Sequence, residues 1–158
     1  MLRIAVFSDT HGNTAPMLKA VRRERPDVLI HLGDHDRDAL VLREEFPDTP
    51  LHSVCGNCDL MPLSPEKLVV QLGPVKALLT HGHIYNVSRW QADSLVYAAQ
   101  EAGAQIAMFG HTHRAVNDQL GGVTLLNPGT AGKGADLSWA RVTIFDNGAI
   151  SCEIRDFT

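Results

Sequence analysis

An α/β fold is predicted for this chain by three observations. Short apolar runs alternate with amphipathic segments through the first two-thirds of the sequence, the order typical of a parallel sheet with helical crossovers. Turn signals such as Asp146-Asn147-Gly148 join short strands in the last third. The chain has 158 residues, 44% hydrophobic and 20% charged. We therefore expect one globular domain spanning residues 1–158.

The first third predicts three buried strands separated by two helices. Each strand is an apolar run that ends in polar, turn-forming residues, and each helix ends at a proline, Pro26 or Pro47. The predicted strands cover residues 2–8, 28–32 and 51–55, and the predicted helices cover 15–25 and 38–46. Because short joins and helical crossovers return the chain to the same end of a sheet, we expect these strands to be parallel.

The rest of the chain predicts a similar middle section and then a change of pattern. In the middle we expect strands at 67–72, 75–80 and 105–109 and a helix at 88–102, with a turn at Gly73-Pro74. The last third predicts strands at 116–120, 123–126, 139–145 and 150–154. Turn signals at Gly121-Gly122 and Asn127-Pro128-Gly129 make this last third meander-like and mostly antiparallel.

Charge and cysteine content exclude several classes of partner. The net charge is -4, which gives no positive field for a nucleic-acid polymer, and no apolar run is long enough to span a membrane. Three cysteines are an odd number, which argues against a disulfide scaffold and favours the cytoplasm. A homo-oligomer is left open. The unusual feature is histidine, with eight residues.

Residues able to bind metal recur at the carboxyl ends of the predicted strands. They are Asp9, His11, Asp34, Asn57, His81, His111 and His113. Loops at that edge of an open α/β sheet converge on one crevice, so these side chains can meet. Mixed oxygen and nitrogen ligands without thiolate suit Mn, Fe, Co, Ni or Zn, and seven ligands are too many for one catalytic ion with open positions. Two ions that hold a bridging hydroxide would use them all and would hydrolyse a phosphate ester.

Each of these motifs alone is weak evidence, and other residues have simpler interpretations. Asp, Asn and Gly are ordinary loop residues, so only the joint occurrence of the motifs carries the prediction. His31 and His52 are interpreted as strand residues and His35 as a loop residue. Cys55 and Cys58 form a Cys-x-x-Cys pair of the thioredoxin type, a redox alternative that would leave the metal motifs as coincidence.

The motifs, in this order, resemble those of the calcineurin-like metallophosphoesterase superfamily. They are Ser8-Asp9-Thr10-His11, Leu32-Gly33-Asp34, Gly56-Asn57-Cys58-Asp59, Thr80-His81-Gly82-His83 and Gly110-His111-Thr112-His113. The Gly-Asn-Cys-Asp variant and Asn127-Pro128-Gly129 are similar to the small prokaryotic phosphodiesterase branch. The resemblance covers essentially the whole chain.

This resemblance implies a four-layer sandwich of two mixed β-sheets flanked by helices, with two divalent ions, manganese first among the choices. The first ion would be held by Asp9, His11, Asp34 and His113. The second would be held by Asp34, Asn57, His81 and His111. Asp34 would bridge the two ions.

One departure from the family bears on the mechanism. Many members have histidine after the Gly-Asn pair, where it is thought to act on the leaving oxygen, and this chain has Cys58. A thiol is a poorer proton donor than an imidazolium. His83 is the best substitute acid, and the equal alternative is that it orients His81 or Asp59. We group His83, Cys58 and Asp59 as the candidate catalytic residues.

The substrate prediction is a small phosphodiester. A monoester carries one more negative charge, and the nearby cations Arg37, Arg114 and Lys133 all lie outside the motifs. The sequence therefore predicts a metal-dependent phosphodiesterase. The alternative is a non-catalytic protein-binding scaffold on the same fold, which would be expected to lose a metal ligand.

Overall fold

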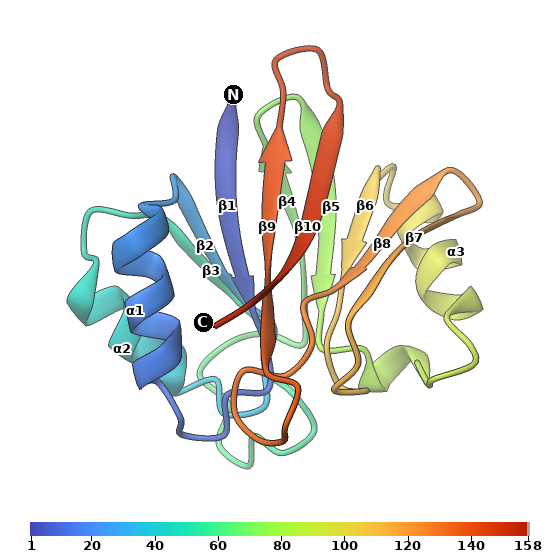
Figure 1. The fold of residues 1–158 in the computed structure, drawn as a ribbon. Coiled ribbons are helices and arrows are strands. Elements are labelled where there is room, and N and C mark those ends of the chain that lie inside the picture. Colours follow the sequence, from blue (N-terminus) through green and yellow to red (C-terminus); the bar gives the residue numbers. More distant parts are fainter. Residues whose placement is uncertain (158) are drawn as a thin grey trace.

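Two five-stranded mixed β-sheets form the centre of the computed structural model, which describes residues 1–157 (Figure 1). Helices cover the outer faces of both sheets, which gives four layers. The predicted four-layer α/β sandwich is therefore confirmed. The single domain over residues 1–158 stays a prediction, and its last residue, Thr158, lies outside the described residues.

The first sheet has the strand order β10-β9-β1-β2-β3. Its strands are β1 (Leu2–Phe7), β2 (Val28–His31), β3 (Leu51–Ser53), β9 (Ser138–Ile144) and β10 (Ile150–Asp156). As predicted, β1, β2 and β3 are parallel, whereas β9 runs antiparallel to β1 and to β10. Helices α1 (Ala15–Glu24) and α2 (Asp38–Glu45) cover its outer face (Figure 1).

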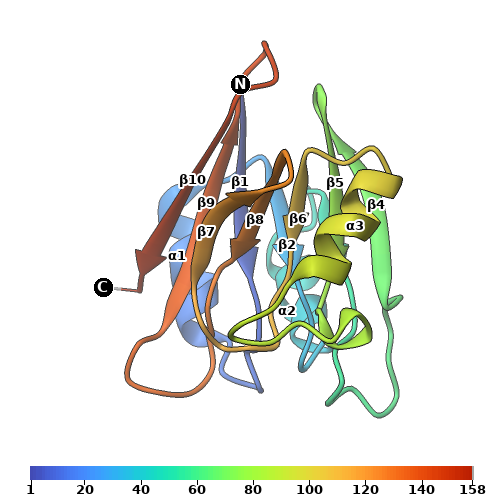
Figure 2. The ribbon, with the colours of Figure 1, turned by 90° about the vertical axis from the view of Figure 1, so that its right-hand side faces the viewer.

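The second sheet has the order β4-β5-β6-β8-β7. Its strands are β4 (Lys67–Leu72), β5 (Val75–Thr80), β6 (Ile106–Met108), β7 (Val116–Leu120) and β8 (Val123–Asn127). Strands β5, β6 and β8 are parallel, and β4 and β7 are antiparallel edge strands. Helix α3 (Asp93–Glu101) covers the outer face and lies in front of the sheet in Figure 2.

Alternating side chains divide the core into three layers. In β1, Ile4 and Val6 face the space between the sheets, while Ala5 and Phe7 pack against α1 together with Met17. Period-two alternation of apolar residues on both faces explains why β1 is a continuous apolar run. The sandwich therefore holds both sheets at a fixed relative position, which matters because both carry site loops.

The chain connectivity of the last third differs from the prediction. The antiparallel pairs β7–β8 and β9–β10 are as predicted. They do not form a meander, because β8 joins β6 in parallel and the segment after Asn127 crosses to the other sheet, where β9 pairs with β1. In the middle section, Gly73-Pro74 joins an antiparallel hairpin. Turn chemistry is local and does not specify the pairing partner of the next strand.

The helix predicted at 88–102 begins only at Asp93. The Ser88 hydroxyl accepts a hydrogen bond from the Trp90 N–H, and backbone hydrogen bonds link Ser88 with Gln91. Serine side chains offer the backbone such turns in competition with a helix. A short 3-10 helix, η1 (His83–Tyr85), precedes this turn. Within residues 1–157, no helix has the length and apolar character needed to cross a bilayer.

Candidate metal centre

Loops from both sheets converge at the lower edge of the molecule in Figure 1. Strands β1, β2 and β3 end before Asp9, Asp34 and Asn57, so these residues lie in loops at the carboxyl ends of the first sheet. Strands β5 and β6 end before His81 and His111 in the second sheet. The centre thus lies where the two sheets meet, an arrangement that the single-crevice argument did not foresee.

Four of the predicted ligands form one compact group. Each of Asp9, His11, Asp34 and His113 offers a ligand atom, and these atoms lie within 4.8 Å of one another. His113 Nε2 is 3.1 Å from Asp9 Oδ1, and His11 Nε2 is 4.0 Å from the same oxygen and 3.9 Å from Asp34 Oδ2. This spacing allows one ion to contact all four.

The other three predicted ligands lie beside this group. His81 Nε2 is 3.3 Å from Asp34 Oδ2 and 3.7 Å from Asp9 Oδ1. His111 Nδ1 lies 2.9 Å from Asn57 Oδ1, and its ring centroid is 5.2 Å from that of His81. Asp34 therefore lies between the two groups, with Oδ2 close to histidines of both.

Several ligand atoms are buried and make no hydrogen bond, although imidazole nitrogens and carboxylate oxygens of the group lie 3.1 to 4.0 Å apart. Among the described residues, Asp9 Oδ1, His11 Nε2 and His81 Nε2 are buried without a hydrogen bond. An unsatisfied buried polar group costs about 1–3 kcal/mol, so three of them in one place require an explanation. His81 Nδ1 donates to the Leu32 carbonyl, which directs the Nε2 lone pair toward the carboxylates. The donor set and its unsatisfied atoms fit a divalent cation.

The backbone at the ligands is strained. Five of the predicted ligands have positive φ: Asp9 at 55°, His11 at 47°, Asp34 at 53°, His111 at 69° and His113 at 59°. A non-glycine residue in the left-handed region costs about 1–2 kcal/mol. Such strain persists where surrounding contacts over-determine the conformation, and it gathers at functional sites.

Two motif glycines are required by close approach. A Cβ atom at Gly56 would overlap Asp34 Oδ1, and one at Gly110 would overlap Ser8 Oγ and lie 2.7 Å from Asp9 Oδ2. Glycine is the residue that lets backbone approach a side chain this closely. These two glycines therefore let loops of different strands pack directly against the two aspartates.

The buried charges affect one another. Burial raises the pKa of Asp9. Burial also acts on Asp34, but nearby His81 and the N–H of Cys58, 3.0 Å from Oδ1, outweigh it and hold the pKa of Asp34 below its usual range. Burial opposes the charged form of His81 too, yet Asp34 and Asp9 raise its pKa. A metal ion bound here would have to displace the proton of His81, because ligation needs neutral imidazole.

Asp59 joins two loops by hydrogen bonds, and its grouping with the candidate catalytic residues stays a prediction. Its Oδ1 accepts the N–H groups of His35 and Asp36 at 2.8 and 3.0 Å, and its Oδ2 accepts that of Gly56 at 2.7 Å. The carboxylate thus fastens the loop of Asp34 to the loop of Asn57. These three hydrogen bonds give Asp59 a structural role in holding the two loops together.

Two further carboxylates were missed by sequence reasoning. Asp36 accepts the N–H groups of Leu63 and Ser64, and Asp38 accepts the N–H of Gly12 and binds His35 Nδ1 at 2.8 Å. Both are buried. The available signal was the alternation of aspartates at positions 34, 36 and 38, because a buried loop needs acceptors for its N–H groups.

Cys58 and His83 lie at the margin of the centre. The Cys58 side chain is exposed, and partial burial together with the charge of Asp34 raises the pKa of its thiol. The His83 ring lies 5.6 Å from that of His81 and 6.3 Å from that of His111, and its buried Nδ1 has no hydrogen bond in the described part of the chain. His83 therefore orients neither His81 nor Asp59 by a hydrogen bond.

The remaining histidines have structural surroundings. His31 is fully buried, with Nε2 2.9 Å from the Thr10 hydroxyl and Nδ1 accepting the Gly33 N–H. His35, in the loop before α2, pairs with Asp38 at the start of that helix, and His52 lies in β3. The thiols of Cys55 and Cys58 both have raised pKa values, first through burial, which is the opposite of an activated redox pair.

Comparisons with known proteins agree with this geometry. The profile of the calcineurin-like phosphoesterase superfamily domain matches residues 2–147. The probable metallophosphoesterase YsnB of Bacillus subtilis is 31% identical over 132 residues, 82% of this chain and 75% of its own length. A phosphodiesterase of Methanocaldococcus jannaschii is 25% identical over 145 residues, 81% of this chain and 83% of its own.

Solved structures have the same fold. A conserved Streptococcus pneumoniae protein, described as a predicted phosphoesterase, superposes with a TM-score of 0.78 at 30% identity, covering 98% of both chains. Vps29 of Entamoeba histolytica, solved in complex with zinc, superposes with a TM-score of 0.77 at 22% identity, covering 99% of this chain and 100% of its own. The likeness to Vps29 concerns the fold alone.

Proposed function

Because this chain belongs to the calcineurin-like phosphoesterase superfamily, whose members are metal-dependent, we propose that it is a dinuclear phosphodiesterase. The observation that carries the proposal is the set of buried, unsatisfied atoms Asp9 Oδ1, His11 Nε2 and His81 Nε2 at one point. A structural role alone gives no reason to leave such atoms unpaired at a cost in stability.

We assign two ligand sets that share one carboxylate. Asp9, His11, Asp34 and His113 would hold the first ion, supported by their 4.8 Å cluster. Asn57, His81 and His111 would hold the second together with Asp34, supported by the 3.3 Å approach of His81 to Asp34 and by the pairing of His111 with Asn57. Manganese is our first choice of metal, with Fe, Ni, Co and Zn as substitutes.

The ions, when bound, supply Lewis-acid chemistry: a water-derived nucleophile at neutral pH and neutralisation of charge on the phosphate. The chain contributes orientation. The Leu32 carbonyl fixes the His81 tautomer, and the Cys58 N–H fixes the Asp34 carboxylate by its Oδ1, leaving Oδ2 toward the histidines. The loop fastened by Asp59 keeps Asn57 in register with Asp34.

Protonation of the leaving oxygen is the weak step of this centre. The raised pKa of Cys58 keeps its thiol neutral but makes it a poor acid at neutral pH. We assign the role of proton donor to His83, whose Nδ1 is unpaired beside His81 and His111. Burial and the neighbouring His81 lower the pKa of His83, so its protonated form is a strong acid but a minor one at neutral pH. Substrates with good leaving groups should therefore be preferred.

A small phosphodiester is our proposed substrate class. Selection of the extra charge of a monoester would need cations beside the ligands, and the sequence places Arg37, Arg114 and Lys133 outside the motifs. The Methanocaldococcus relative bears the name phosphodiesterase. The cytoplasm is our proposed compartment, favoured by the free thiols of Cys55, Cys58 and Cys152.

The test uses protein stripped of metal and titrated with manganese. We expect uptake of two ions per chain and recovery of activity on bis(4-nitrophenyl) phosphate, with lower kcat/KM on the monoester 4-nitrophenyl phosphate. Asp34→Asn and His111→Ala should abolish activity and reduce metal uptake, whereas the control His52→Ala, in β3 away from the ligands, should change neither. Unchanged activity in both site variants would refute the proposal.

The second candidate function is a protein-binding scaffold. The loop after Asp59 exposes Leu60, Met61 and Leu63, with 94% of the Leu60 surface accessible. Exposed apolar groups of this kind mark interaction surfaces. Metal-loaded protein that is inert on monoesters, linear diesters and 2′,3′- and 3′,5′-cyclic nucleotides would favour this function over catalysis.

A further inference from the structure

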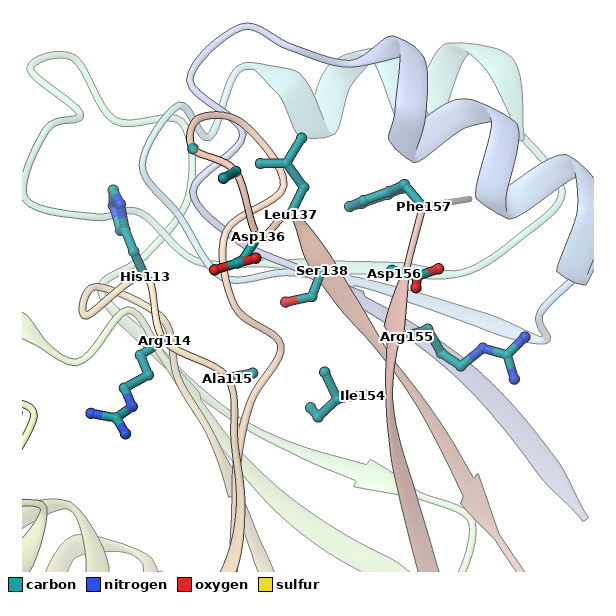
Figure 3. A pocket seen from close by; sticks show the side chains of 12 residues that line it. His113, Arg114, Ala115, Asp136, Leu137, Ser138, Ile154, Arg155, Asp156 and Phe157 are labelled. Atoms are coloured by element: carbon teal, nitrogen blue, oxygen red, sulfur yellow. The ribbon is translucent and has the colours of Figure 1, made fainter.

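A groove of about 740 Å³ opens beside His113 (Figure 3). Three segments form its walls: the chain after His113, the loop leading into β9, and the end of β10. Its volume falls within the range of ordinary small-molecule sites, about 300–1,000 Å³. His113 is both a wall of this groove and a member of the first ligand cluster, so the groove adjoins the candidate metal centre.

The groove lies on the open side of the centre. His113 has 42% of its side chain exposed, whereas His81 is fully buried. On the other side, the rings of His81, His83 and His111 crowd one another, with centroids 5.2 to 6.3 Å apart. A phosphate held at the centre therefore has room for a bulky substituent on the His113 side.

The chemistry of the walls favours a neutral, partly apolar group. Ala115, Leu137, Ile154 and Phe157 supply apolar surface. The Arg114 and Arg155 side chains extend toward opposite ends of the groove in Figure 3, and Arg155 is paired with Glu153. The Asp136 carboxylate has no hydrogen-bond or ion-pair partner among residues 1–157 and can accept hydrogen bonds from hydroxyl groups. A second phosphate would meet this carboxylate unfavourably.

The same walls identify which substituent of a diester the groove receives. A leaving oxygen needs a proton donor. Among the walls, His113 is assigned to the first ion, and the one hydroxyl, that of Ser138, donates to the Pro128 carbonyl. Arginine does not give up its proton near neutral pH. The leaving group therefore departs elsewhere, and the groove is left for the substituent that stays on the phosphate.

We propose that this groove is the subsite for the retained substituent of a phosphodiester, and that it selects a neutral, hydroxyl-bearing body of nucleoside size. The inference rests on the proposed phosphodiesterase function and deepens it. Hydrolysis breaks the bond between phosphorus and the leaving oxygen, water supplies the new P–O bond and the proton of the leaving alcohol, and the nucleoside phosphate remains as product.

The test compares two diesters with the same leaving group, thymidine 5′-(4-nitrophenyl) phosphate and methyl 4-nitrophenyl phosphate, on manganese-loaded protein. We expect kcat/KM to favour the nucleoside ester by about tenfold or more, the scale at which apolar pockets discriminate. Ala135→Trp, which places a large ring in the groove, should lower this ratio to about one. Ala149→Trp is the matched control in the distant β9–β10 turn and should retain the full ratio.

Ala115→Trp repeats the test from the opposite wall, in case the first variant does not fold. A ratio near one in the unmodified protein, or a ratio that both groove variants leave unchanged, overturns the subsite while the phosphodiesterase function stands. Failure to hydrolyse either diester overturns the proposed function, and the subsite with it. Selective loss of the nucleoside preference in the groove variants supports both.

Discussion

His31 should make the free energy of unfolding of this protein depend on pH between about pH 4 and pH 6.5. Burial lowers its pKa to about 4, against an ordinary value near 6.5. The unfolded chain therefore takes up a proton as the pH falls through 6.5, and the folded protein does so only near pH 4. Between these values the unfolded state binds more protons, so stability is fully present above pH 6.5 and is lost as the pH falls.

The size of the effect follows from the shift. A difference of about 2.5 pKa units, at 1.36 kcal/mol per unit, corresponds to about 3 kcal/mol. His31→Asn keeps an acceptor for the Gly33 N–H, and His31→Gln keeps a group that reaches Thr10, and neither titrates. Both variants should be less stable than the unmodified protein at pH 8, and this deficit should shrink by about 3 kcal/mol at pH 4.

Urea unfolding of the three proteins in a metal chelator, at half-unit steps from pH 4 to pH 8, measures the deficit directly. The chelator removes metal from all three proteins, so that loss of metal at low pH does not contribute to the measured differences. A deficit that stays constant across this range would refute the reasoning, because it would mean that His31 is not held neutral by its buried surroundings.

Three further predictions concern the centre itself. Chelation should lower the melting temperature, and manganese at a hundred times its Kd should restore about 2.7 kcal/mol for each ion bound; an unchanged melting curve would contradict a metal bound to the native state. Gly110→Ala should lower the free energy of unfolding by about 1–3 kcal/mol through overpacking, and it should reduce metal uptake. At Gly12 a Cβ has open space, so Gly12→Ala should show in calorimetry only the cost of its positive φ. Asp59→Ala should lower the free energy of unfolding in urea by about 3 kcal/mol, because three N–H groups lose their acceptor. Asp48→Ala, at an exposed position, is the neutral control. Equal effects of the two substitutions would refute the proposal that Asp59 holds the two loops together.

The first half of the fold was predictable because its pairing is local. Each crossover returns the chain beside the strand just left, so apolar runs and helix stops were enough to order β1, β2 and β3. The second half was not, because β9 pairs with β1 across more than a hundred residues, and the turn residues at Asn127 are compatible with a hairpin or a crossover. Side-chain pattern fixes the faces of a strand and leaves its neighbour open.

The candidate site was likewise predictable only in part. The positions of the seven predicted ligands at strand ends followed from the pattern, and the structure brings them together, although their roles as ligands stay a prediction. The supporting carboxylates could not be assigned, because the roles of Asp36 and Asp59 depend on N–H groups of loops that meet only in the folded chain. The carboxyl that joins two loops cannot be distinguished in sequence from one that faces a substrate.

The division of ligands between the two sheets has a mechanical consequence. The carboxylates and the amide extend from one sheet and three of the four histidines from the other, so bound ions would act as a clasp across the sandwich. Small sliding of one sheet over the other would change every distance at the centre together. Ion binding would then slow the opening of the core between the sheets, far from the ions. A substitution that destabilises this core would in turn lower the affinity for metal.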